Sequence, residues 1–83
     1  MKEETIRVYG ATWCPDTSRA RRILDKNHIR FAWHDVDNDR SARAYVESVN
    51  HGNCRIPTIV FLDGSILVEP ADEELESRLA ETS

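Results

Sequence analysis

Apolar and polar residues alternate in two segments of the first half of the chain, as they do in half-buried β-strands. Residues 5–10 carry Ile6 and Val8 on one face and end at a glycine. Residues 29–37 repeat the pattern, with three alternate positions on one face: Phe31, Trp33 and Asp35. We therefore predict one strand in each segment.

Residues 56–70 contain two short apolar runs, and Asp63-Gly64 lies between them. This dipeptide is typical of tight turns that join antiparallel strands, because both of its residues tolerate left-handed backbone angles. The segment is therefore predicted to form a β-hairpin.

Apolar residues recur at helical spacing in three other segments. The first helix is predicted from Pro15 to about Asn27, since a proline is tolerated at the start of a helix. The second lies within residues 37–50, where Asp37 or Asp39 is expected to cap it. Its apolar stripe has four members: Ala42, Tyr45, Val46 and Val49. The third covers residues 71–80, and its acidic first turn complements the helix dipole.

The predicted order β-α-β-α-β-β-α indicates an α/β domain. Strands that alternate with helices favour parallel β-α-β crossovers, so we expect two of them in the first part of the chain. The hairpin then adds an antiparallel end to a mixed sheet. Periodicity leaves two-layer and three-layer arrangements open.

Length and charge limit the classes of function. The 83 residues are enough for one small domain, residues 1–83, and 40% apolar with 31% charged residues suits a soluble globular protein. The acidic second half, with two Lys/Arg against seven Asp/Glu in residues 51–83, argues against a nucleic-acid surface. Four basic residues of the first helix form either a solvated face or a docking patch for an acidic partner or anionic thiol: Arg19, Arg21, Arg22 and Lys26.

The first ten residues are too polar for a secretory signal, and no apolar run approaches the length of a membrane span. We therefore expect a cytoplasmic protein that does not contact membranes. In a reducing compartment two cysteines are more often catalytic or metal-binding than a structural disulfide.

Cys14 directly precedes the predicted helix start at Pro15. The nucleophile in disulfide exchange is the thiolate, and the unpaired N–H groups and positive dipole end of a helix N-terminus stabilise an anion. Trp13 is expected to shield one side of the sulfur and to offer a flat face to a substrate. The alternative is an inert cysteine buried in the core.

The runs "VYGATWCPDT" and "RIPTIVFLDGS" resemble the glutaredoxin branch of the thioredoxin-like superfamily. The longer run "SVNHGNCRIPTIVFLDGSILVEP" is most similar to the mycoredoxin-type glutaredoxins of actinobacteria. The resemblance extends from about residue 6 to residue 79.

This resemblance implies a four-stranded mixed sheet with helices on both faces. It also implies that Pro57 is a cis-proline lying against Cys14, and that the backbone of Ile56 pairs with an extended substrate. Without the resemblance, an ordinary trans-proline at a strand start would be the simpler interpretation.

The motif Cys14-Pro15-Asp16-Thr17 lacks the second cysteine of dithiol relatives. A monothiol route remains open, because a second small thiol can regenerate the first cysteine. The Thr17 hydroxyl either donates a hydrogen bond to the Cys14 thiolate or bonds its own backbone. The net effect of the Asp16 carboxylate on the thiolate is left open, because it opposes the anion and favours the helix.

The small thiol is predicted to be mycothiol or a similar bacterial thiol, with glutathione as the other possibility. Glutathione-using relatives often carry a lysine shortly before the cysteine and a Gly-Gly-x-Asp turn before the last helix. Here the corresponding places hold Ala11 and "EPADEE". Arg55 and Asp72 are candidates for contacts with polar groups of the thiol, although Arg55 also fits a solvated loop residue.

Cys54 lies three residues before Pro57 and is expected near the active-site end. It is either a resolving cysteine that forms a disulfide with Cys14 or a passive loop residue. One His-x-x-Cys pair, His51 with Cys54, is a poor zinc signature without a second pair, so we expect no metal site.

The leading hypothesis is therefore a monomeric, monothiol thiol–disulfide oxidoreductase that acts on S-thiolated proteins with a small thiol as co-substrate. One alternative is a carrier that bridges a [2Fe–2S] cluster in a dimer through one cysteine per subunit. Another is a scaffold that binds thiol adducts or peptides without turnover.

Overall fold

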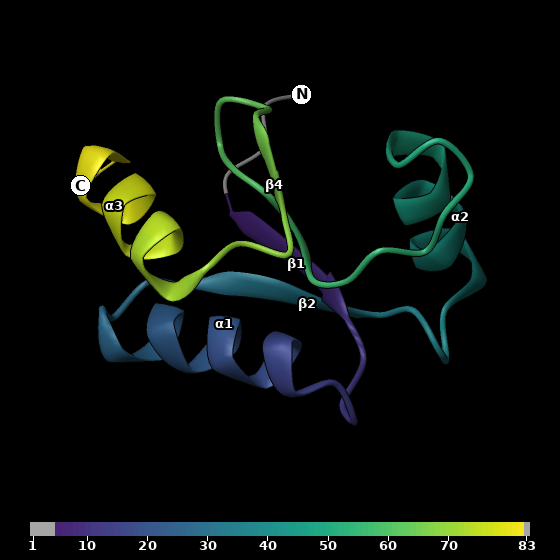
Figure 1. Ribbon diagram of the computed structural model, residues 1–83, viewed down its shortest axis with the longest axis horizontal. Helices are drawn as coiled ribbons and strands as arrows, with labels where there is room; N and C mark the ends of the chain where they lie inside the picture. Colours follow the sequence, from purple (N-terminus) through teal and green to yellow (C-terminus); the bar gives the residue numbers. More distant parts are fainter. Residues whose placement is uncertain (1–4, 83) are drawn as a thin grey trace.

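The computed structural model describes residues 5–82, and its elements follow the predicted order β-α-β-α-β-β-α (Figure 1). The strands and helices have these bounds: β1 Ile6–Gly10, α1 Pro15–Lys26, β2 Phe31–Asp35, α2 Arg40–Val49, β3 Thr58–Val60, β4 Ile66–Val68 and α3 Asp72–Thr82. Each predicted element is present, and most are a few residues shorter than the pattern suggested.

The four strands form one mixed sheet in the order β2-β1-β3-β4. β1 and β2 are parallel, whereas β3 is antiparallel to β1 and to β4. Of the two parallel crossovers that we expected, the first, from β1 through α1 to β2, is confirmed. The second, from β2 through α2 to β3, is wrong, because β3 runs antiparallel to β1 and therefore to β2. Asp35 at the end of β2 pairs with Gly10, and Thr58 at the start of β3 pairs with Tyr9. The chain thus leaves β2 and enters β3 at the same end of the sheet, so β3 must run in the opposite direction to β2.

Alternate residues of the central strands pack against helices on opposite faces of the sheet. On one face Ile6, Val8 and Ile59 pack with the buried residues of α1 and α3. On the other face Tyr9 and Val60 pack with the buried residues of α2. The sheet therefore has helices on both faces, as the resemblance implies, and the domain has three layers.

Helices α1 and α3 lie together on their face of the sheet. Their contact is apolar at its centre, where Leu75 and Leu79 of α3 belong to the same buried cluster as Ile23 and Leu24 of α1. Two exposed ion pairs lie at the rim of the contact between α1 and α3: Arg19 with Asp72 at 3.4 Å, and Lys26 with Glu76 at 3.3 Å. Such pairs contribute about 0–1 kcal/mol each, so apolar burial contributes more to the stability of this contact.

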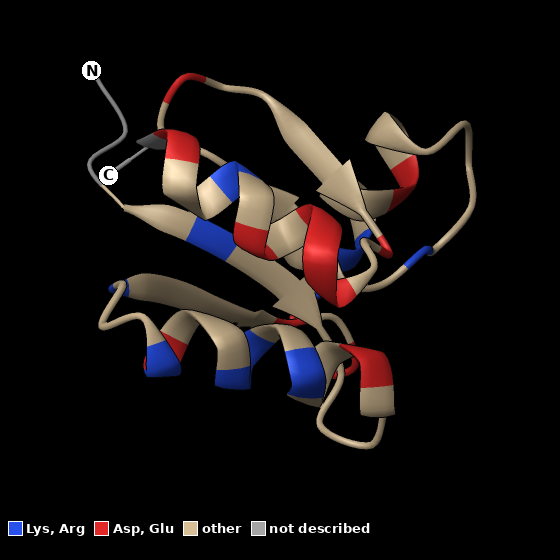
Figure 2. Cartoon of the chain, turned by 60° about the vertical axis from the view of Figure 1, so that its left-hand side comes forward, with Lys and Arg blue, Asp and Glu red and all other residues tan. Residues whose placement is uncertain are grey.

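The basic cluster of α1 is largely engaged within the fold. Figure 2 shows the basic bands along α1 and the acidic bands of α3. Besides the two ion pairs to α3, the Arg21 guanidinium lies 4.0 Å from the centre of the Trp33 ring. Three of the four basic residues thus have partners, and a docking role for the cluster receives no support.

The predicted cap and turn are present. Asp39 is the N-cap of α2 and accepts a hydrogen bond from the Ala42 N–H at 3.2 Å. Gly64 has a φ of 88° in the turn between β3 and β4. There the Ser65 hydroxyl and N–H both donate to the Asp63 carboxylate, which holds the pKa of that carboxyl below its usual value.

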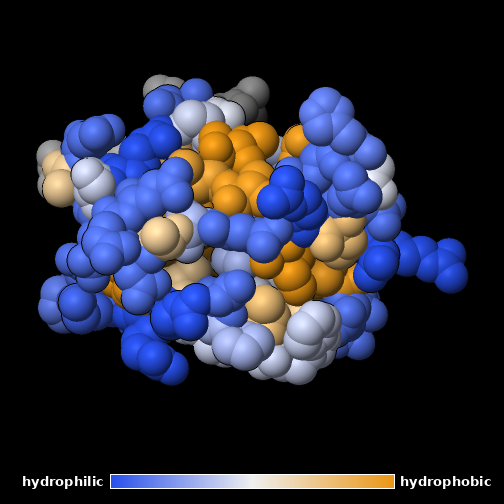
Figure 3. Space-filling view, viewed as in Figure 1, coloured by the Kyte–Doolittle hydropathy of each residue, from blue (hydrophilic) through white to orange (hydrophobic). Residues whose placement is uncertain are grey.

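Apolar surface gathers in the middle of the face shown in Figure 3, where β4 lies. The three residues of this edge strand are each half-buried. In the described part of the chain, no helix combines the length and the apolar character needed to cross a membrane.

Replacement of Gly10 by a larger residue is predicted to destabilise the protein because α1 approaches this position closely. A Cβ at this position would lie 2.4 Å from Thr17 Cγ2 and 2.6 Å from Thr17 Oγ1. We expect Gly10→Ala to lower the free energy of unfolding by about 1–3 kcal/mol in a denaturant titration. The double variant with Thr17→Ala should recover a large part of this loss, and equal losses in the two backgrounds would contradict the explanation.

Candidate active site

Cys14 occupies the N-cap position of α1, immediately after the tight turn that leaves β1. Its N–H donates to the Ala11 carbonyl at 3.1 Å, and its own carbonyl accepts the first helical hydrogen bond from Ser18 at 3.0 Å. The residue is 8% exposed and packs in the apolar cluster on the α2 face of the sheet. The cysteine is therefore held in place by its backbone and can be approached from a limited direction.

The first turn of α1 presents free donors beside this cysteine. Pro15 has no N–H, and the N–H groups of Asp16 and Thr17 form no hydrogen bond with any described residue. N-cap side chains normally accept from these two positions. A negatively charged sulfur at Cys14 is placed to accept there, with the helix dipole adding to the attraction.

The Asp16 carboxylate is bound to a neighbouring cation. It forms an ion pair and hydrogen bond with Arg19, which also contacts Asp72 at the start of α3. The arginine offsets the negative charge that Asp16 places near Cys14. Asp72, a candidate thiol-binding residue, is thus engaged with α1 in this structure.

Thr17 is fully buried, and neither of its two expected hydrogen bonds is formed. Its Oγ1 has no partner among the described residues, whether Cys14 or the helix backbone. The reason is steric: the side chain is turned toward the sheet and lies against the backbone of Gly10. Thr17 therefore acts here as a packing residue at the place of the missing second cysteine.

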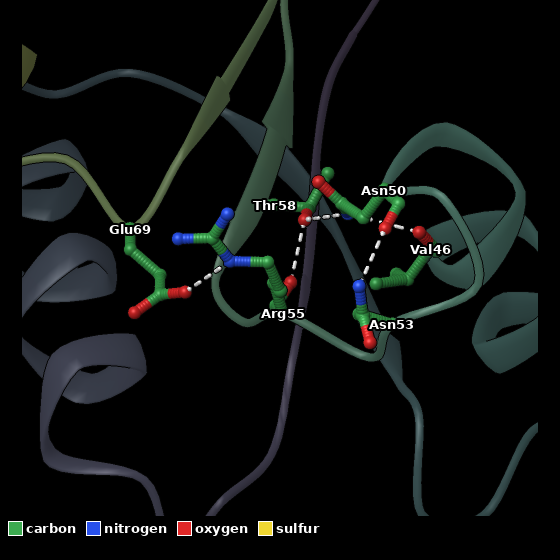
Figure 4. Close-up of polar contacts among 6 residues, drawn as sticks. All are labelled: Val46, Asn50, Asn53, Arg55, Thr58 and Glu69. Atoms are coloured by element: carbon green, nitrogen blue, oxygen red, sulfur yellow. Dashed lines mark hydrogen bonds and ion pairs between the residues drawn. The ribbon is translucent and has the colours of Figure 1, made fainter.

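The segment between α2 and β3 is braced by a polar network (Figure 4). The buried Thr58 hydroxyl donates to the Arg55 carbonyl at 2.7 Å and accepts from Asn50 Nδ2 at 3.3 Å. Asn50 Nδ2 also donates to the Val46 carbonyl, and Asn53 Nδ2 donates to the Asn50 carbonyl. These bonds hold the approach to Pro57 in a fixed shape.

The Ile56–Pro57 peptide bond is cis, as the resemblance implies. The Pro57 carbonyl accepts from the Glu69 N–H at 2.8 Å, whereas the N–H and carbonyl of Ile56 bond to no described backbone group. Ile56 packs against the same cluster as Cys14. An extended chain passing Cys14 would therefore find an open backbone edge at Ile56.

Arg55 lies next to this edge, but its charge is already paired. Its Nε lies 2.9 Å from a carboxylate oxygen of Glu69 (Figure 4). Because Glu69 also bonds to Pro57 through its backbone, the pair ties the segment before β3 to the end of β4. A thiol bound by Arg55 would have to compete with Glu69.

Cys54 is half-buried and packs against the cluster that contains Cys14, and both cysteines are free. The structure thus brings the two thiols to one end of the domain without joining them. In residues 5–82, no three His, Cys, Asp or Glu side chains are gathered as metal ligands.

Trp13 extends into solvent and is 68% exposed. Its indole N–H donates to the Asp37 carboxylate at 2.7 Å. Sequence reasoning named Asp37 only as a possible helix cap and used Thr58 only as part of the family motif, and it assigned no role to Glu69 or Asn50. Of these residues, only Thr58 could have been singled out from the sequence. It directly follows the predicted cis-proline, so its hydroxyl is close to the segment before Pro57.

Thr17→Val tests whether the buried hydroxyl has a role. Valine keeps the shape and removes an unpartnered polar group, so we expect unchanged or higher stability, by up to about 1 kcal/mol in a denaturant titration. The rate at which iodoacetamide alkylates Cys14 at neutral pH should not change. A slower alkylation, restored by Thr17→Ser, would show that the hydroxyl assists the sulfur after all.

Thr58→Val tests the brace of the segment before Pro57. The substitution leaves the Arg55 carbonyl and one Asn50 N–H without this partner, and we expect a loss of about 1–3 kcal/mol in the free energy of unfolding. Thr58→Ser keeps the hydroxyl and serves as the matched control. Equal stability of the two variants would argue that packing of the methyl group, rather than the network, matters.

Comparisons with known proteins agree with this geometry. Residues 6–67 match the family model described as Glutaredoxin. A Mycobacterium tuberculosis protein whose name places it among the glutaredoxins is 34% identical over 79 residues, covering 95% of this chain and 94% of its own length. Mycoredoxin 1 of Corynebacterium glutamicum is 31% identical over 74 residues, covering 89% and 91%.

Solved structures show the same fold. The crystal structure of the thioredoxin-like protein BC3987 has a TM-score of 0.74 and 26% identity, covering 87% of this chain and 96% of its own. The glutaredoxin Grx-1 from Archaeoglobus fulgidus has a TM-score of 0.72 and 22% identity, covering 95% and 87%. With a thiol at the N-cap of α1, a cis peptide bond at Ile56–Pro57 and these relatives, the chain belongs to the glutaredoxin family and is a mycoredoxin-like thiol–disulfide oxidoreductase.

Proposed function

We propose that the protein removes a small thiol from S-thiolated client proteins by a monothiol route, with Cys14 as its nucleophile. The observation that carries the proposal is the placement of Cys14 at the N-cap of α1, beside the open N–H groups of Asp16 and Thr17. These groups stabilise a thiolate, and the thiolate is the form that attacks a disulfide.

In the first step the Cys14 thiolate attacks the small-thiol sulfur of the client's mixed disulfide. A disulfide between Cys14 and the small thiol forms, the client's sulfur–sulfur bond breaks, and the client leaves as a thiolate that takes a proton from water. The free N–H and carbonyl of Ile56 are suited to hold the extended part of the substrate during this attack.

In the second step another molecule of the small thiol, as its thiolate, attacks the small-thiol sulfur bound to Cys14. The Cys14 thiolate is released, and the small thiol leaves as its symmetric disulfide. Thr17, at the place of a second cysteine, has no thiol to compete with this step. Both steps proceed in a reducing cytoplasm, where small thiols are kept reduced.

Mycothiol is the small thiol that we propose. Glutathione is an anionic peptide whose carboxylates are bound well by free cations, whereas mycothiol is a sugar-linked cysteine derivative without carboxylates. Arg55 and Arg19 are each paired with carboxylates of the fold, and Ala11 stands where relatives often carry a lysine. The name of one relative, mycoredoxin 1, also points to this thiol.

Variants of the two cysteines test the route. Cys14→Ser is expected to reduce the release of small thiol from a mycothiolated peptide to the uncatalysed rate, because no nucleophile remains. Cys54→Ser, the matched single-thiol control, should keep wild-type turnover. Turnover is measured by mass spectrometry on mycothiolated and glutathionylated forms of one peptide, with the mycothiolated form consumed faster.

Two results would contradict the proposal. Loss of turnover in Cys54→Ser, together with a Cys14–Cys54 disulfide in the oxidised wild-type protein, would replace the monothiol route by a dithiol one. Equal or faster consumption of the glutathionylated peptide would overturn the choice of small thiol while leaving the route intact.

A further inference from the structure

Trp13 combines high exposure with a fixed side chain. Its ring is 68% exposed, yet its Nε1–H donates to Asp37 Oδ2 at 2.7 Å across 24 positions of the sequence. An exposed indole without such a partner would sample several rotamers, and a ligand that packs on it would have to order it. The hydrogen bond restricts the ring before any ligand arrives.

Asp37 is itself held by the turn that follows β2. Its N–H donates to Asp35 Oδ1 at 2.9 Å, and Asn38 Nδ2 donates to Asp35 Oδ2 at 2.8 Å. The same turn is tied to β1, because the Val36 N–H donates to the Gly10 carbonyl at 2.9 Å. The carboxylate that accepts from the indole is therefore fixed to the end of β1, where the turn that leads to Cys14 also starts.

We propose that Asp37 is a positioning residue, which holds the Trp13 indole as a flat apolar wall beside Cys14 for the disulfide-bearing partner to pack on. This inference rests on the proposed function, since the wall serves the approach of a mixed disulfide. Asp37 acts on the sulfur chemistry only through Trp13, so its loss should weaken substrate binding and leave the chemical step unchanged.

The test compares Asp37→Ala with Asp37→Asn. Both variants lose the charge, but the asparagine keeps an oxygen that can accept from the indole. Asp37→Ala is expected to raise KM for the mycothiolated peptide about three- to tenfold at unchanged kcat and melting temperature, because the ligand must then order one more side chain when it binds. Asp37→Asn should restore most of the affinity.

The Trp13→Phe background shows whether Asp37 acts through the indole. Phenylalanine cannot donate to Asp37, so adding Asp37→Ala to Trp13→Phe should leave KM unchanged. A similar rise in KM in both backgrounds would overturn the inference, because Asp37 would then act by charge or by its turn. An unchanged KM in Asp37→Ala alone would overturn it as well.

A spectroscopic readout is independent of turnover. The chain has two tryptophans, so Trp13→Phe assigns the Trp13 indole N–H signal in a nitrogen-15 NMR spectrum. We expect Asp37→Ala, but not Asp37→Asn, to shift this signal upfield and to speed its exchange with water. An unchanged signal in Asp37→Ala would overturn the hydrogen bond on which the inference depends.

A wild-type protein without turnover would refute the proposed function rather than this inference. The same variants are then compared by the rate at which mycothiol disulfide modifies Cys14, a single exchange that releases one molecule of mycothiol. A rate that falls about three- to tenfold in Asp37→Ala and recovers in Asp37→Asn would support the proposal that Asp37 holds the Trp13 indole for the incoming disulfide. Equal rates would overturn it.

Discussion

The antiparallel pairing of β3 with β1 is the constraint on which the active site depends. It sets Thr58 opposite Tyr9, so the residues before Thr58 lie beyond the end of β1, where the chain turns toward Cys14. The open backbone of Ile56 and the sulfur of Cys14 are thereby gathered at one edge of the sheet, although 42 positions separate them in the sequence. The Asn50–Thr58–Arg55 network and the Arg55–Glu69 pair stabilise the loop that this pairing requires, and so they serve the site without touching the sulfur.

The helix terminus supplies the second half of the site. Cys14 stands where serine, threonine or aspartate would normally cap a helix, and its thiol leaves the Asp16 and Thr17 N–H groups without an acceptor. Leaving these donors open costs some helix stability, which apolar burial of α1 against the sheet and α3 offsets. The two open N–H groups therefore face the one side chain at this helix end that carries a sulfur.

Local pattern predicted the elements well, since each depends on neighbours in the sequence. The start of α1 at Pro15, the Asp39 cap and the Gly64 turn follow from backbone rules that a short window contains. The direction of β3 did not follow, because it depends on where residues 50–57 lead the chain. The two hydrogen bonds expected of the Thr17 hydroxyl were also wrong. A helical wheel cannot show that Gly10 approaches this side chain so closely. Asp37 and Glu69 stood among many carboxylates, and nothing in the sequence distinguished them from solvated ones.

Two arginines near the site are paired with carboxylates of the fold. Arg19 is shared by Asp16 and Asp72, and Arg55 is bound to Glu69, so each of these cations already has an acidic partner within the fold. A ligand that required either arginine would have to compete with a carboxylate of the fold for it, at a cost of about 0–1 kcal/mol for each exposed pair. The groups that remain available are the peptide edge at Ile56 and the exposed ring of Trp13. Both can contact an extended segment of a ligand without a charged partner, the first through its backbone and the second through its apolar face.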